Sequence, residues 1–102
     1  MADVAKPQSC REMFVWLGAG NDKTLNAQQQ VECQKIGTFM GGHPVLGQML
    51  QHAILLRYQR ATGVEVLSGA TAIDWQALIA WFVANSGTIM NIVLTFMGLF
   101  GL

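Results

Sequence analysis

Hydrophobic positions in the first sixty residues recur at the three- and four-residue spacing of α-helices. Ser9 and Glu12 have the spacing of a capping box, which predicts a short helix over residues 10–17. A glutamine-rich segment with an imperfect apolar stripe predicts a second helix over residues 23–40. Pro44 follows a glycine break and is placed to open a third, amphipathic helix that continues to about Arg60.

The last third of the chain has a different pattern, because it is hydrophobic on every side. Thr71 and Asp74 have capping-box-like spacing, and residues 75–102 form an uninterrupted run without a charged side chain. Crossing the hydrocarbon core of a bilayer takes about 20 helical residues, so this run is long enough to span. We therefore predict an all-α fold with short N-terminal helices and one long C-terminal apolar helix, from about Ile73, that is transmembrane.

Aromatic and basic residues mark the start of this predicted span. Trp75 and Trp81 lie near its beginning and Tyr58 precedes it, positions where amphipathic rings favour the membrane interface. Arg57 and Arg60 lie on the same side. If the chain has a single span, the positive-inside rule places its N-terminal part in the cytoplasm. The alternative is the central helix of a soluble bundle, which would need an oligomer to surround it.

Small and polar residues interrupt the apolar run at alternating four- and three-residue steps. In lipid, such a stripe permits close helix approach, and each hydrogen bond across helices contributes about 0.6 to 2 kcal/mol. Thr88 and Thr95 could instead bond to their own backbone, but that alternative does not explain Asn91. The predicted helix-packing residues are Ala84, Thr88, Asn91, Thr95 and Gly98.

Composition supports a chain divided into two regions. Hydrophobic residues make up 52% of the sequence and charged residues 12%, about half the share of charge in an average soluble domain. Six basic and six acidic side chains cancel, so no overall field favours nucleic acid as a partner. All six basic residues lie in the first sixty positions. The expected regions are an N-terminal helical region over residues 1–67 and a C-terminal apolar helix over residues 68–102.

Residues that could carry chemistry are few and scattered. Cys10 and Cys33 are a candidate disulfide in an oxidising compartment, or buried thiols in a reducing one. Together with His43 and His52 they match no compact zinc module, so no metal ligands are predicted. No catalytic set has a recognisable local context. We therefore expect no enzymatic activity, cofactor or small-molecule substrate.

These observations predict a small, non-enzymatic structural or accessory subunit of a larger assembly, embedded in the lipid bilayer and associating with itself or other proteins. Two alternatives remain open. The striped helix could line a pore after oligomerisation. The chain could also build a filament or shell, because residues 36–56 form a second uncharged run before a basic loop. That apolar hairpin resembles the outline of conjugative pilins, which pack hairpins into filaments with lipid; the resemblance covers about the last two-thirds of the chain, is architectural only and carries no family assignment.

Overall fold

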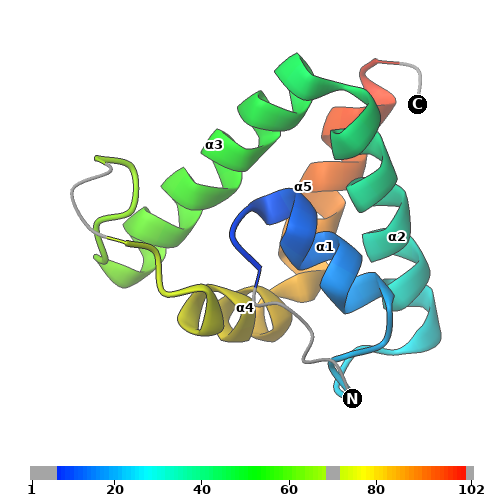
Figure 1. The fold of residues 1–102 in the computed structure, drawn as a ribbon, viewed down its shortest axis with the longest axis horizontal. Helices are drawn as coiled ribbons and strands as arrows, with labels where there is room; N and C mark the ends of the chain where they lie inside the picture. The colour runs from blue at the N-terminus through cyan, green and yellow to red at the C-terminus, as the bar shows by residue number, and fades with distance from the viewer. Residues whose placement is uncertain (1–6, 69–71, 101–102) are drawn as a thin grey trace.

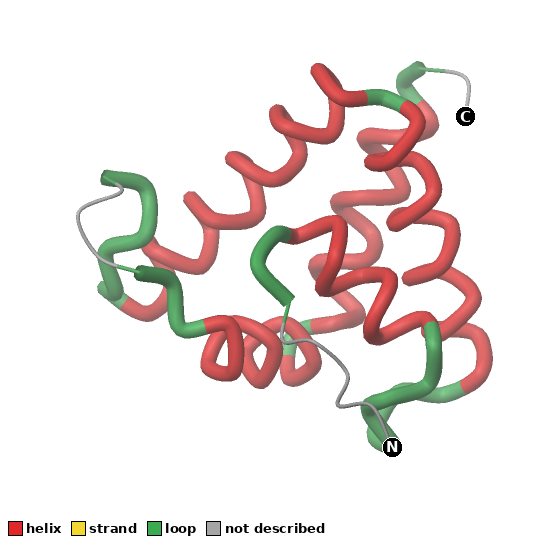
Figure 2. The backbone as a smooth tube through the Cα atoms, in the orientation of Figure 1, coloured by secondary structure: helices red, strands yellow, loops and turns green. Residues whose placement is uncertain are grey.

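The computed structural model describes residues 7–68 and 72–100, and over these residues the protein is all-α. Figure 2 shows helices joined by loops, without a strand in the described part of the chain. The helices, in chain order, are α1 (Cys10–Gly18), α2 (Ala27–Gly42), α3 (Pro44–Thr62), α4 (Trp75–Ala84) and α5 (Ser86–Gly98). The predicted all-α class is confirmed.

Local hydrogen bonds explain where the first three helices begin. The side chain of Ser9 accepts a hydrogen bond from the Glu12 amide at 3.1 Å, as the sequence predicts. Helix α2 begins four residues later than expected because Asn26 and Gln29 form a complete capping box there. Pro44 is the first residue of α3, where its missing amide proton leaves no bond unmade.

The C-terminal apolar segment is two helices where the sequence pattern predicted one. Asp74 caps α4 by accepting from the Ala77 amide at 3.2 Å, whereas Thr71 lies outside the described residues. The axes of α4 and α5 differ by 92° across Asn85. No single described helix is both long and apolar enough to cross a bilayer, although the bent pair has the length and composition to do so together.

Two side chains fix this bend. Asn85 Nδ2 donates to the Trp81 carbonyl at 2.8 Å, which closes the end of α4. Ser86, the buried first residue of α5, accepts a hydrogen bond from Gln29 Nε2 at 2.9 Å. The second bond ties the corner of the C-terminal pair to α2, so that the bend is held by tertiary contacts as well as by the local chain.

Helix α1 supplies the centre of the hydrophobic core. Its residues Met13, Phe14 and Leu17 are completely buried. Phe14 makes an edge-to-face contact with Phe82 of α4, with ring centroids 5.2 Å apart. In Figure 1, α1 lies in front of α5 and is framed by α2, α3 and α4. The C-terminal pair therefore covers the apolar face of α1 and buries its own inner face in the same contact.

The closest helix pairing is between α1 and α2, and a glycine permits it. A Cβ atom added to Gly18 would lie 2.7 Å from Gln34 Cγ and 3.0 Å from the Gln34 backbone nitrogen. The Gln34 side chain also donates to the Gly18 carbonyl at 2.7 Å. The absence of a side chain at Gly18 thus lets the end of α1 lie directly on the backbone of α2.

Replacing Gly18 by Ala should destabilise the protein by about 1–3 kcal/mol, the usual cost of overpacking. Gly87→Ala in α5 is the matched control, because a Cβ there meets nothing within 4 Å and alanine favours a helix. The control should be neutral or slightly stabilising. Urea unfolding followed by circular dichroism measures both differences, and equal stability of the two variants would contradict this account of the α1–α2 contact.

Candidate functional site

The outer face of α5 is uncharged and made mostly of small or polar side chains. Thr88, Asn91, Thr95 and Gly98 are all exposed, while Val93 and its neighbours on the opposite face pack into the core. These four predicted packing residues therefore share one accessible face. Ala84 is exposed as well but belongs to α4, so the 92° bend separates it from the other four.

Large apolar side chains extend this uncharged surface. Ile92 is 38% exposed on α5, and Leu99 and Phe100, just beyond the helix, are 77% and 47% exposed. Such side chains contribute favourable free energy when a second surface covers them. The end of α5 thus combines exposed apolar groups with a face that lets a neighbouring backbone approach closely.

The predicted interface aromatics occupy different environments. Tyr58 is 4% exposed and contacts the ring of Trp81 edge to face, with centroids 5.3 Å apart. Trp75 is partly buried at the start of α4. The structure therefore brings Tyr58 and Trp81 together between α3 and α4, and leaves Trp75 apart from them. Their role at a membrane interface stays a prediction.

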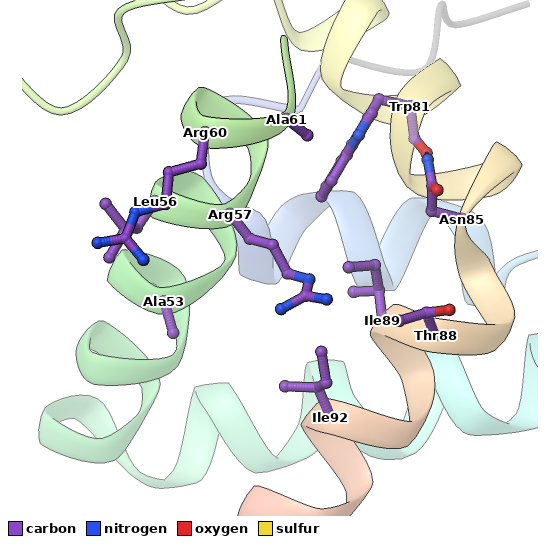
Figure 3. A pocket seen from close by; sticks show the side chains of 10 residues that line it. All are labelled: Ala53, Leu56, Arg57, Arg60, Ala61, Trp81, Asn85, Thr88, Ile89 and Ile92. Carbon is purple, nitrogen blue, oxygen red and sulfur yellow. The ribbon is translucent and has the colours of Figure 1, made fainter. Parts of the chain in front are cut away.

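A cleft of about 700 Å³ separates α3 from the α4–α5 pair. Figure 3 shows its two walls, with Arg57 extending from α3 towards Ile89 and Trp81 closing the end beside α4. We call it the α3–α5 cleft. It is lined by Ala53, Leu56, Arg57, Arg60, Ala61, Trp81, Asn85, Thr88, Ile89 and Ile92.

The electrostatic character of the α3–α5 cleft is positive. Arg57 and Arg60 line it, and none of its lining residues is acidic. Within residues 7–68 and 72–100, neither guanidinium group takes part in an ion pair or hydrogen bond. Asn85, the N-cap of α5, makes no side-chain cap bond, so the partial positive charge of that helix end adds to the two arginines.

Sequence reasoning did not find this cleft, because its walls are distant in the chain. Ala53 to Ala61 form one wall and Trp81 to Ile92 the other. From the sequence alone, Arg57 and Arg60 are only basic residues that precede the predicted span. Neither arginine has an acidic residue four positions away on α3, and this absence was a signal in the sequence that their charges are available to bind an anion.

Cys10 and Cys33 are buried free thiols. Burial raises the pKa of Cys10 to about 12. Burial, with a smaller contribution from the charge of Glu32, raises the pKa of Cys33 to about 12. Because only the unfolded chain ionises these thiols between about pH 9 and 12, they lower the free energy of unfolding as pH rises through that window. At neutral pH both are unreactive core side chains.

His43 is also part of the packing. Its ring stacks on Phe39 with centroids 4.8 Å apart, and Nδ1 lies 3.0 Å from the Phe39 carbonyl oxygen. His52 is exposed on α3. In the described part of the chain, no three His, Cys, Asp or Glu side chains are grouped as a metal ion would require.

Native protein at pH 8 should resist alkylation by iodoacetamide at both cysteines, because the raised pKa leaves roughly a thousandfold less thiolate than in a solvent-exposed thiol. Denatured protein should react at both without prior reduction. Mass spectrometry counts the labels. Rapid labelling of the native chain would contradict the burial, and labelling of denatured protein only after reduction would support the candidate disulfide.

Comparison with family models, with curated proteins and with solved structures finds no match to this chain.

Proposed function

We propose that this protein is a small, non-enzymatic structural or accessory subunit of a membrane-bound assembly. In this proposal the α4–α5 pair is the membrane-embedded part, and the outer face of α5 is the surface that packs on another helix. The observation that carries the proposal is the combination of an uncharged run over residues 75–102 with an exposed, uncharged outer face on α5.

Helix length limits how the pair can enter a bilayer. At about 1.5 Å per residue, α4 with 10 residues is about 15 Å long and α5 with 13 residues is about 20 Å. Neither reaches across a hydrocarbon core of about 30 Å. A full crossing therefore requires the bend at Asn85 to straighten, whereas the bent pair can occupy one leaflet. The part of the chain that precedes α4, which holds every basic residue, would stay on the cytoplasmic side.

Self-association is the partner interaction that the outer face of α5 supports best. Thr88, Asn91, Thr95 and Gly98 repeat at three- and four-residue steps, so a second helix can approach along the whole face. No hydrogen bond within the described residues uses the Asn91 side chain, which leaves its amide available for a partner. The bend between α4 and α5 does not discriminate between the accessory subunit and the filament, shell or pore alternatives, and no observation favours any of these alternatives above the accessory subunit.

If α4–α5 is embedded, the protein should remain with the membrane pellet after alkaline carbonate extraction. Thr95→Lys should move it substantially to the supernatant, because a lysine in hydrocarbon costs about 2.5 to 3.5 kcal/mol. Thr38→Lys is the control, since Thr38 is an exposed threonine on α2 that lies outside the embedded pair. Complete release of the folded wild-type chain would refute membrane integration.

Asn91→Leu should weaken self-association in mild detergent by about three- to thirtyfold, which corresponds to losing one hydrogen bond across helices. The side chain is exposed, so the fold of each subunit should be unchanged. Gln28→Leu is the control, because it removes an exposed side-chain amide on α2 rather than on α5. This variant should associate as strongly as the wild type. Sedimentation equilibrium measures the dissociation constants, and the same oligomer strength in all three proteins would remove Asn91 from the interface.

A further inference from the structure

We propose that the α3–α5 cleft binds an anionic amphiphile, with a carboxylate or phosphate headgroup beside Arg57 and a single alkyl chain along the apolar wall of α5. Such a ligand can reach the cleft from solution or from a membrane leaflet. The inference does not depend on membrane integration of α4–α5, because it uses only side chains that line the cleft of the folded subunit.

The case for an anion comes from charge that nothing in the described chain neutralises. The Arg57 guanidinium lies between the two walls in Figure 3. Arg60 also lines the cleft, but its guanidinium extends to the other side of α3 in the same view, so Arg57 is the cation nearest the apolar wall. Neither has an ion pair or hydrogen bond within the described residues. A guanidinium group binds carboxylate and phosphate through paired N–H donors, so it suits either headgroup. The N-terminus of α5, which has no side-chain cap, also favours an anion because its backbone N–H groups carry partial positive charge.

The case for an alkyl chain comes from the rest of the lining. Ile89 and Ile92 present branched apolar side chains from α5, and Ala53 lies on the side of α3 towards them. Leu56 also lines the cleft, with its side chain directed away from α5 in Figure 3. Asn85, Thr88 and the indole N–H of Trp81 are the uncharged polar side-chain groups of the lining, too few for a sugar or nucleotide that carries many hydroxyl or base groups. The surface is therefore positive where Arg57 extends and apolar beside it, which is the pattern of a charged head and a hydrocarbon tail.

Size and rigidity also favour a small ligand. The volume of about 700 Å³ lies within the usual range of small-molecule sites, roughly 300 to 1,000 Å³. Trp81 at the end of the cleft is held against the buried ring of Tyr58, and Ile89 is anchored in the core. The walls are thus largely formed before a ligand arrives, so that binding need not order them.

Laurate below its micelle concentration is the probe, and the indole N–H resonances of the three tryptophans are the readout. Laurate should shift the Trp81 resonance saturably and leave that of Trp16, on α1, unchanged. Arg57→Gln should weaken binding about tenfold, as expected for the loss of a charge-assisted hydrogen bond. Arg11→Gln removes an exposed arginine that does not line the cleft, and should bind as the wild type does.

Dodecyltrimethylammonium, with the same chain and the opposite charge, should bind at least tenfold more weakly than laurate. Equal binding of both amphiphiles, or of wild type and Arg57→Gln, would overturn the proposal. A second arm replaces laurate with vesicles of phosphatidylglycerol or phosphatidylcholine. Arg57-dependent binding to the anionic vesicles alone assigns the headgroup to membrane lipid, and binding of neither probe refutes the site. Laurate binding by a protein that carbonate releases would support the cleft while refuting membrane integration.

Discussion

The mutual burial of α1 and the C-terminal apolar pair is the contact on which the rest of the structure depends. Phe14 and Phe82 meet edge to face at its centre, and both side chains are completely buried. A chain of 102 residues can build only a modest core, and that core takes its buried side chains from both halves of the chain. This contact also divides α5 into an inner face that the chain itself covers and an outer face that it leaves accessible.

That division changes what the uncharged C-terminal segment requires from its surroundings. A helix that is hydrophobic all round needs lipid or protein on every side. Here Val93 and the other inward residues already have protein around them, and the outward residues are mostly small or polar. The surface that a partner could still cover is thus limited to one face of α5 and the apolar residues at its end. A partner helix or the interfacial region of a bilayer can cover this surface without unfolding the subunit.

Much of the fold was predictable from local chemistry, and the failures have physical reasons. Ser9 and Pro44 each start a helix where the sequence predicts one, because capping depends on neighbouring residues alone. Asp74 is the N-cap of α4, which begins at Trp75, two residues after the predicted start near Ile73. The bend was missed although Asn85, Ser86 and Gly87 form a run of residues that favour turns. The apolar segments on both sides suggested one continuous helix, and the bond from Gln29 that stabilises the corner comes from a distant part of the chain.

The two parts of the candidate site, the outer face of α5 and the α3–α5 cleft, differ in how far the sequence predicts them. Four of the five predicted packing residues share a face because they lie within one helix, where spacing determines position. The α3–α5 cleft depends on how α3 is placed against α4 and α5, so no local pattern encodes it. Arg57 and Trp81 become neighbours of one cavity only through the fold, and the sequence showed them merely as a basic and an aromatic residue near an apolar run.

The bond between Gln29 and Ser86, which joins positions 57 residues apart, has a consequence for biosynthesis. Because the chain is made from its N-terminus, α1 and α2 are synthesised before the corner at Asn85 and before Phe82, whose ring covers Phe14. During that interval the apolar side of α1 is exposed to water or is covered by another protein or a membrane. Contacts between residues so distant in sequence also form slowly. A nascent chain of this protein is therefore most prone to aggregation between the emergence of Phe14 and that of Phe82, and a chaperone or the membrane surface is of most use to it then.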